Sequence, residues 1–325
     1  MANARQHHTP VQGSLHRVPH PATVSAEAPS LFDSAFLAKI EQLHLLARRL
    51  FRGERRAERR SRAHGSSLEF ADHREYTPGD ELRSIDWSAF GRLDRLFVKL
   101  FEHEQDLPVS FLVDASSSMR WQPQGARRIT KLDQSRKLTA ALAYIALANL
   151  DALNIHFLAD GLLSELGVAR GKAHFHSVLE FLSSPPAPGR RTDLLAGIRT
   201  FTQRVKRRGL VIVISDFFDP SGFEEPLAML RHCQFETHVL HVLDAAELTP
   251  VETGDLRLVE CETGAGLDVT STEALLRRYR AEIATFNDSL QSFCVQRGIG
   301  HARVTTDMAF ENVVLRVLRG GVMLK

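Results

Sequence analysis

Apolar residues from Leu31 to Leu50 recur every three or four positions along the chain. This spacing places them on one face of a helix, and Asp33 or Ser34 stands where a helix needs an N-cap. The pattern therefore predicts an amphipathic helix that begins near residue 31 and, with its arginine-rich continuation, runs to residue 63.

The sequence on either side of this helix has a different character. Residues 1–30 follow neither a helical nor a strand period and are interrupted by prolines, so we expect a flexible tail. From residue 64 to residue 106, short segments such as Leu96–Phe101 alternate apolar and polar positions between turn signals at Thr77–Asp80 and Gly91. This pattern predicts a small β-containing unit.

From residue 107 to residue 325, apolar runs alternate with helical patterns. The runs predict strands at Val109–Val113, Asn154–Leu158, Leu210–Ser215, Thr237–Leu243 and Ala302–Thr305, with a strand-like pair around Leu256–Glu260. Helices are predicted at Ile129–Leu150, Phe175–Leu182, from Asp193 onward, and at Glu224–His232, Ser271–Arg297 and Phe310–Leu318. Such alternation is typical of a parallel sheet covered on both faces, so we expect a doubly wound, mostly parallel α/β domain.

Composition narrows the class of protein. With 41 basic and 39 acidic residues, a net charge of +2 and 43% hydrophobic residues, the chain is no disordered polyelectrolyte and can bury a sizeable core. No apolar run approaches the roughly 20 residues of a membrane-spanning helix, and the N-terminus lacks the apolar run of a secretory signal. We expect a cytoplasmic protein without an integral membrane segment, whose three separated cysteines are buried thiols.

Carboxylates and hydroxyls stand directly after two of the predicted strands and before one predicted helix. These candidate ligands are Asp114, Ser116, Ser118, Thr192 and Asp216. Because sites in open parallel sheets form outside the carboxyl ends of the strands, we expect the three loops to meet. Hard oxygen donors suit an octahedral cation that keeps some of its water. The sequence therefore predicts a Mg2+ site, with Mn2+ or Ca2+ as alternatives.

Each loop also has an ordinary structural explanation. An Asp-x-Ser-x-Ser turn makes a good helix entry, Thr192 followed by Asp193 looks like an N-cap, and Asp216 can start an Asx-turn. The three loops occur together, in this order and beside the expected elements, and it is this conjunction that favours a shared site.

In order, context and residue type, the loops resemble the metal-ion-dependent adhesion site of von Willebrand factor A domains. The resemblance implies that the hydroxyls of Ser116 and Ser118 bind the metal directly. It implies that the carboxylates of Asp114 and Asp216 bind directly or through water, while Thr192 switches between the two. A Glu or Asp of a partner would fill the remaining position, so that binding depends on the metal and no bond is broken.

A longer segment resembles a more particular group. It comprises Gly65-Ser66-Ser67-Leu68-Glu69-Phe70-Ala71, Arg74, Tyr76, Pro78-Gly79-Asp80, Arg83 and Ile85-Asp86-Trp87, followed by Leu96-Phe97-Val98-Lys99 and Glu102. These residues resemble domain-of-unknown-function family fifty-eight, and the resemblance extends over about residues 45–325. It implies a von Willebrand factor A-like protein, encoded beside a MoxR-type AAA+ ATPase, that acts as a partner or adaptor of that ATPase.

We therefore expect a non-enzymatic adaptor or chaperone-like protein that binds a MoxR-type AAA+ ATPase or its cargo. The alternative is a metal-dependent hydrolase that uses Asp114 and Asp216. A haloacid-dehalogenase-type phosphatase is disfavoured because it needs a second Asp where Ser116 stands. The sequence also lacks a Gly-x-x-x-x-Gly-Lys-Ser/Thr loop and a Gly-x-Ser-x-Gly elbow, which disfavours nucleotide and acyl chemistry.

Two further segments invite a functional hypothesis. Arg48–Arg62 is strongly basic and could bind an acidic protein face or, as an alternative, nucleic acid. We favour the protein partner, because no aromatic residue between Phe51 and Arg62 could stack on bases. In Glu69–Trp87, charged residues alternate with apolar ones, which predicts a structural lattice of ion pairs with Trp87 as a packing anchor.

Overall fold

The computed structural model describes residues 31–58, 69–78, 80, 85–102, 108–122, 129–188 and 192–319. Contacts divide the chain into residues 1–30 and residues 31–325, and all of the described residues belong to the second unit. The predicted tail lies outside the described residues. So does the arginine cluster, because residues 48–58 are described as helix backbone without side chains and 59–62 are not described.

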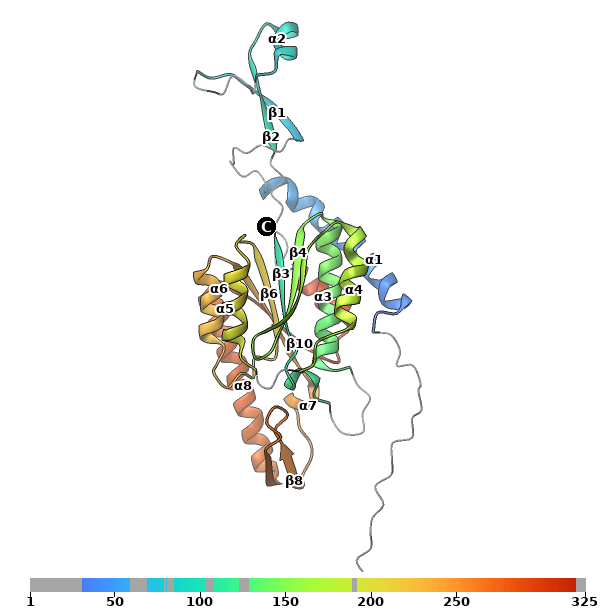
Figure 1. Ribbon diagram of the computed structural model, residues 1–325, viewed down its shortest axis with the longest axis vertical. Coiled ribbons are helices and arrows are strands. Elements are labelled where there is room, and N and C mark those ends of the chain that lie inside the picture. Colours follow the sequence, from blue (N-terminus) through green and yellow to red (C-terminus); the bar gives the residue numbers. More distant parts are fainter. Residues whose placement is uncertain are drawn as a thin grey trace, which may run out of the picture. The chain divides into compact units, whose positions relative to one another are not determined.

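A six-stranded sheet forms the centre of the structure (Figure 1). Its strands are β3 (Val109–Asp114), β4 (Ala152–Leu158), β5 (Leu162–Arg170), β6 (Leu210–Ser215), β7 (Glu236–Leu243) and β10 (Gly300–Thr305). They lie in the order β10-β7-β6-β3-β4-β5, and every pair is parallel except β4 with β5. This confirms the predicted α/β class with a mostly parallel sheet.

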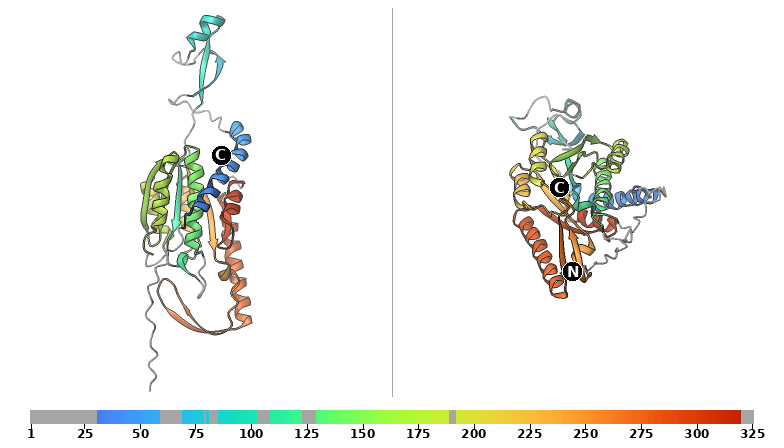
Figure 2. Two further views of the ribbon diagram at one scale, coloured as in Figure 1. Left: turned by 90° about the vertical axis from the view of Figure 1, so that its right-hand side faces the viewer. Right: turned by 60° about the horizontal axis from the view of Figure 1, so that its bottom comes forward.

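Helices cover both faces of this sheet, as Figures 1 and 2 show. The helices of one face are α1 (Ser34–Glu58), α3 (Lys131–Ala148), α4 (Phe175–Ser183) and α9 (Phe310–Arg319), and those of the other are α5 (Leu194–Arg204), α6 (Glu224–His232) and α8 (Glu273–Gln296). Each face has its own apolar core, because side chains alternate along every strand. On β3, for example, Phe111 belongs to one core and Leu112 to the other.

The first helix, α1, begins at Ser34, and the Asp33 carboxylate accepts a hydrogen bond of 2.7 Å from the Phe36 amide. Asp33 is thus the predicted cap. The buried face of α1 joins the core shared with α3 and α9 through Phe36, Ile40, Leu43 and Ala47. The predicted amphipathic pattern therefore corresponds to tertiary packing in the first half of this helix.

Edge strand β5 was not predicted from the sequence. It runs antiparallel to β4, and most of its side chains are partly or fully exposed. A strand at the edge of a sheet buries little of its surface, so its sequence lacks the continuous apolar run that marks the central strands.

The small unit predicted near residues 64–106 contains an antiparallel pair, β1 (Glu69–Glu75) with β2 (Phe97–Glu102), and an unpredicted short helix, α2 (Trp87–Leu93). The Asp86 carboxylate caps α2 by accepting hydrogen bonds from the amides of Ser88 and Ala89. Trp87 is 64% exposed, so the expectation that it is a packing anchor was wrong. The first turn of α2 turns Ala89 inward and leaves the indole outside.

Ion pairs are present in the same unit. Arg74 binds Asp80 at 2.7 Å, and Asp80 also accepts a hydrogen bond from the Thr77 amide. Arg95 forms a second pair with Glu75. These contacts agree with a structural lattice, although residues 81–84 of the predicted segment lie outside the described residues.

Two further elements follow β7. Helix α7 (Ala245–Leu248) comes first, and then an antiparallel hairpin formed by β8 (Gly254–Val259) and β9 (Gly266–Ser271). Cys261 lies in the hairpin turn and is exposed, and Cys233 is half-buried, so only Cys294 fits the expectation of buried thiols. Within the described part of the chain, no helix combines the length and apolar character needed to cross a membrane.

Candidate functional site

The candidate site lies where the connections of the sheet change direction. Strand β3 leads through α3 to β4 on one side, whereas its other neighbour, β6, leads through α6 to β7 on the opposite side. Connections that diverge in this way leave a crevice outside the carboxyl ends of the two strands. Asp114 ends β3, and Asp216 directly follows β6.

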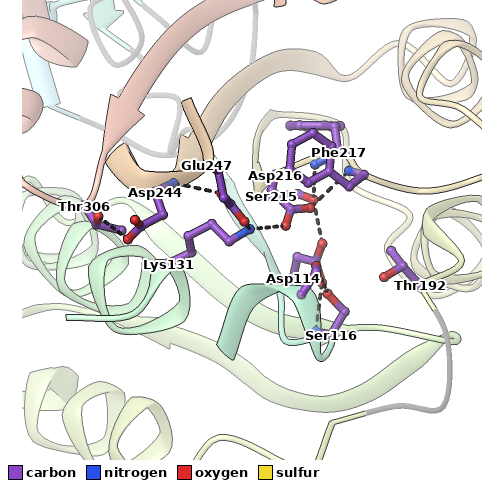
Figure 3. Close-up of polar contacts among 12 residues, drawn as sticks. Asp114, Ser116, Lys131, Thr192, Ser215, Asp216, Phe217, Asp244, Glu247 and Thr306 are labelled. Carbon is purple, nitrogen blue, oxygen red and sulfur yellow. Dashed lines mark hydrogen bonds and ion pairs between the residues drawn. The ribbon is translucent and has the colours of Figure 1, made fainter. Parts of the chain in front are cut away.

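Parallel register brings the ends of β3 and β6 together. Val113 is the partner of Ile214, so the residues that follow them, Asp114 and Ser215, stand side by side. The Ser215 hydroxyl donates a hydrogen bond of 2.5 Å to Asp114 Oδ2, and the Ser116 amide donates one of 2.9 Å to Asp114 Oδ1 (Figure 3). The two oxygens of this buried carboxylate are therefore held by the loop that follows β3 and by the last residue of β6.

The loop after β6 has an unusual backbone conformation. Phe217 has a φ of 59°, a left-handed value that is uncommon for a bulky residue, and its amide donates to the Ser215 hydroxyl at 2.9 Å. The next amide, of Phe218, donates to Asp216 Oδ1 at 3.1 Å. The predicted Asx-turn at Asp216 is therefore present, and it leaves the second carboxylate oxygen, Oδ2, directed elsewhere.

That second oxygen binds an ammonium group that the sequence analysis did not single out. Lys131, at the start of α3, places its Nζ 2.7 Å from Asp216 Oδ2 and 2.5 Å from Glu247 Oε1. The side chains of Lys131 and Asp216 are both 0% exposed. Glu247 is itself fixed, because its other oxygen accepts from the Asp244 amide at 2.9 Å in the capping box of α7.

The hydroxyls of the first loop face one another. Ser116 Oγ lies 3.0 Å from Ser118 Oγ, and Ser116 is buried whereas Ser118 is half-buried. Ser118 opens a single turn of 3-10 helix, Ser118–Arg120, so the Asp-x-Ser-x-Ser sequence is also the helix entry that was considered as its ordinary explanation. The turn nevertheless places the Ser116 hydroxyl beside Asp114 and the Ser118 hydroxyl next to that of Ser116.

Thr192 comes from a different loop, which backbone hydrogen bonds attach to the same end of the sheet. The Asp193 amide donates to the Ala159 carbonyl at 2.7 Å, and the Leu194 amide donates to Asp219 Oδ2 at 2.8 Å. Asp193, rather than Thr192, caps α5. Thr192 therefore does not serve as the cap, and Figure 3 shows its hydroxyl on the side of Asp114 and Ser116.

A carboxylate from far along the sequence contacts Thr192. The Thr192 hydroxyl donates to Glu262 Oε1, and the Thr192 amide lies 3.2 Å from both Glu262 oxygens. Glu262 belongs to the turn of the β8–β9 hairpin. The structure thus brings all five predicted residues to one end of the sheet, with Thr192 engaged by a residue that was not predicted.

Electrostatics at this end of the sheet favour cations. Burial, followed by the negative charge of Asp216, raises the pKa of Asp114 to about 6. Burial alone would lower the pKa of Lys131, but the charges of Asp216 and Glu247 outweigh it and raise that pKa above its usual value. Two carboxylates, Asp216 and Glu247, therefore share the single ammonium of Lys131, and the third, Asp114, is held by the Ser215 hydroxyl and the Ser116 amide.

These residues are of types that could hold a hard divalent cation. Two carboxylates and three hydroxyls supply only oxygen donors, and the excess of negative charge around one ammonium leaves room for further positive charge. Among the described residues there is no cluster of three or more His, Cys, Asp or Glu side chains suited to a metal. Any metal site here therefore depends on the serine and threonine hydroxyls, which suit Mg2+ better than softer metals.

Sequence reasoning missed Lys131, Glu247 and Glu262. A lysine in the first turn of a helix opposes the helix dipole, and this was an available signal for Lys131. Asp244 and Glu247 have the spacing of a capping box, and this local role accounts for Glu247 without any part in the site. Glu262 carries no local signal, because only the hairpin brings it to Thr192.

The chain was compared with known proteins. A family model described as "Protein of unknown function DUF58" matches residues 72–288. Uncharacterized proteins of Mycobacterium bovis and Mycobacterium tuberculosis are each 25% identical over 245 residues, which is 75% of this chain and 76% of theirs. An uncharacterized protein of Mycobacterium avium is 33% identical over 89 residues, or 27% of this chain and 52% of its own.

Two solved structures each cover 66% of this chain. One is the conserved hypothetical protein BatB from Bacteroides thetaiotaomicron, 96% covered at 17% identity and a TM-score of 0.40. The other is an aerotolerance-related membrane protein from Bacteroides fragilis, 98% covered at 16% identity and a TM-score of 0.39. At these TM-scores the likeness supports no inference about this chain. The family model, in contrast, matches more than half of the chain, and the protein therefore belongs to the DUF58 family of unknown function.

Proposed function

We propose that this protein is a von Willebrand factor A-like adaptor whose site binds a partner's carboxylate through Mg2+. The observation that carries the proposal is the pair of buried carboxylates, Asp114 and Asp216, held at the switch point of the sheet beside the hydroxyls of Ser116 and Ser118. Such a site presents a cation on a rigid edge, where it gives an incoming carboxylate a strong and directional anchor.

Within this proposal each side chain has a separate task. Ser116, Ser118 and Thr192 would offer hydroxyl ligands, and Asp114 would offer a carboxylate whose orientation Ser215 holds. Asp216 forms an ion pair with Lys131, so its negative charge is partly compensated before a metal binds. A cation that retains free coordination positions in such a site can accept an acidic side chain from another protein.

The proposed partner is a MoxR-type AAA+ ATPase or a protein cargo that it remodels. The proposal of this partner rests on the family resemblance of the segment around Glu69–Trp87. The partner's identity and the binding of a metal are separate parts of the proposal, so each is tested by its own experiment.

Metal binding is measured first, by titrating Mn2+ and following its electron paramagnetic resonance signal, with Mg2+ as competitor. The wild-type chain is compared with Asp114→Asn, which keeps the shape of the side chain but removes its charge, and with Asp288→Asn, an exposed carboxylate on α8. We expect at least tenfold weaker Mn2+ binding for Asp114→Asn and no change for Asp288→Asn. Equal binding by all three chains would contradict a metal at this site.

The partner is then tested with the same three chains. Each is immobilised with Mg2+ or with EDTA, exposed to the lysate of its source organism, and the retained proteins are identified by mass spectrometry. We expect a MoxR-type ATPase on the wild-type and Asp288→Asn chains in Mg2+ alone. If the ATPase is retained equally with EDTA and by the Asp114→Asn chain, the metal-dependent mechanism is refuted. If the wild-type chain cleaves a phosphoester or ester in a Mg2+-dependent manner, the protein is a hydrolase instead.

A further inference from the structure

The turn of the β8–β9 hairpin reaches the candidate site with a carboxylate. Glu262 accepts hydrogen bonds from both the hydroxyl and the amide of Thr192, and these two residues are 70 positions apart in the sequence. Thr192 is only 1% exposed, so Glu262 covers a residue that the proposed site needs. The contact is therefore made at the site itself and not at its periphery.

Hydrogen bonds within the turn give it a defined shape. The Glu260 amide donates to the Ala265 carbonyl at 2.8 Å, and the Gly264 amide donates to the Glu260 carbonyl at 2.9 Å. Gly264 has a φ of 72°, which a glycine adopts without strain. Glu262 thus projects from a turn that is ordered by its own backbone.

Cys261, the residue before Glu262, is affected by the charged groups of the site. Burial and the charge of Glu262 raise the pKa of the Cys261 thiol, and the charges of Lys131 and Asp216 also act on it. The hairpin turn therefore lies within electrostatic range of the same ammonium and carboxylate that end β6 and begin α3.

Little apolar surface holds the hairpin in this position. Leu258, Val259 and Leu267 are 52%, 61% and 63% exposed. Neither apolar core includes any of the described residues of β8 or β9. Because burial of apolar area is the main source of stability, the hairpin can leave the site at small cost compared with a core element.

We propose that Glu262 is the resident carboxylate ligand of this site, and that a partner binds by presenting an acidic side chain on a similar turn, which displaces it. This inference rests on the proposed function and adds the chemistry of the partner. A carboxylate in the same chain competes at a high effective concentration, so the partner's acidic residue has to be supported by additional contacts. The exposed apolar residues of the displaced hairpin become available for such contacts.

The test uses full-length chains and a probe of known composition. The probe is a fluorescent peptide of residues 257–268, closed through its ends and carrying Cys261→Ser. Its binding to wild type, Glu262→Ala and Glu260→Ala is measured by fluorescence anisotropy in Mg2+ and in EDTA. Glu260→Ala is the matched control, because the Glu260 carboxylate lies on the same turn and contacts Thr263.

We expect the peptide to bind Glu262→Ala about tenfold more tightly than wild type in Mg2+, and Glu260→Ala to behave as wild type. A peptide that also carries Glu262→Gln should not bind. Equal affinity for all three chains would overturn the inference.

A second measurement needs no peptide. Hydrogen exchange of the Thr192 amide should accelerate about tenfold in Glu262→Ala and stay unchanged in Glu260→Ala. Unchanged exchange in both variants would contradict a resident ligand.

Mn2+ binding in the same samples separates this inference from the proposed function. If wild type binds Mn2+ but Glu262→Ala has no effect on the peptide or on exchange, this inference alone fails. If no chain binds Mn2+, the proposed function fails and this inference fails with it.

Discussion

The two sides of the candidate site are built in contrasting ways. On one side, Lys131 and Asp216 are 0% exposed and paired at 2.7 Å within the frame of α3 and β6. On the other, Glu262 contacts Thr192 from a hairpin whose side chains are almost all exposed. The buried pair cannot separate without leaving an uncompensated charge in the interior, whereas the hairpin carboxylate can return to water. The comparison teaches that one half of the site is permanent and the other half can be exchanged.

The largest expected effect comes from removing the buried ammonium. Lys131→Met keeps an unbranched apolar side chain but leaves Asp216 and Glu247 without their cation, so we expect a loss of about 3–5 kcal/mol in the free energy of unfolding. Urea unfolding measures it. The control is Lys39→Met, since Lys39 is 54% exposed in its pair with Glu311 and such pairs contribute at most about 1 kcal/mol. Equal losses of unfolding free energy in Lys131→Met and Lys39→Met would show that the buried ion pair is no more important for stability than an exposed one.

A smaller, pH-dependent effect is expected away from the site, at His156. Burial lowers the pKa of His156 to about 4, while the nearby Glu165 opposes the shift. As the pH falls, His156 takes up a proton near pH 6.5 in the unfolded chain but only near pH 4 in the folded chain. The free energy of unfolding therefore has its full value above pH 6.5 and decreases as the pH falls toward 4. The loss amounts to about 3 kcal/mol at most. Unfolding of His156→Gln between pH 8 and pH 5 should show a shallower pH dependence than wild type.

The small β-containing unit provides an intermediate case. Asp86→Ala removes the carboxylate that caps α2, and loss of an N-cap costs about 1 kcal/mol. We expect faster hydrogen exchange at the amides of Ser88 and Ala89, with little change in the central strands. Asp94→Asn is the control, because it removes the charge of an exposed carboxylate after the same helix and keeps a residue type that tolerates its φ of 51°. Loss of protection across the whole sheet would show that α2 is coupled to the core.

The smallest effect on stability is expected from the exchangeable side of the site. Glu262→Ala should lower the free energy of unfolding by less than about 1 kcal/mol, because the hairpin buries little apolar surface and its departure lets water bind the Thr192 amide and hydroxyl. The same urea titration as for Lys131→Met measures it. A loss of several kcal/mol would mean that Glu262 is a structural residue, and the contrast between the two sides of the site would then be wrong.

Regular elements of the sheet were the most predictable part of this protein. β6 has a continuous apolar run and β3 a nearly continuous one because both of their faces are buried, and their ends marked Asp114 and Asp216 as candidates. The apolar face of α1 could be predicted because its side chains recur at helical spacing and pack into the core. Trp87 was misjudged, because an aromatic side chain in a short helix can lie on either side of it, and only packing selects the side.

Local sequence therefore determined the α/β class, the positions of the central parallel strands and the oxygen donors that follow them. Tertiary structure alone decided that Lys131 neutralises Asp216 across 85 positions and that Glu262 reaches Thr192 across 70. The physical reason is that hydrophobic periodicity reports whether a residue is buried, but it carries no information about which distant charge will be its partner. That pairing is set by strand order, by register and by the path of a hairpin.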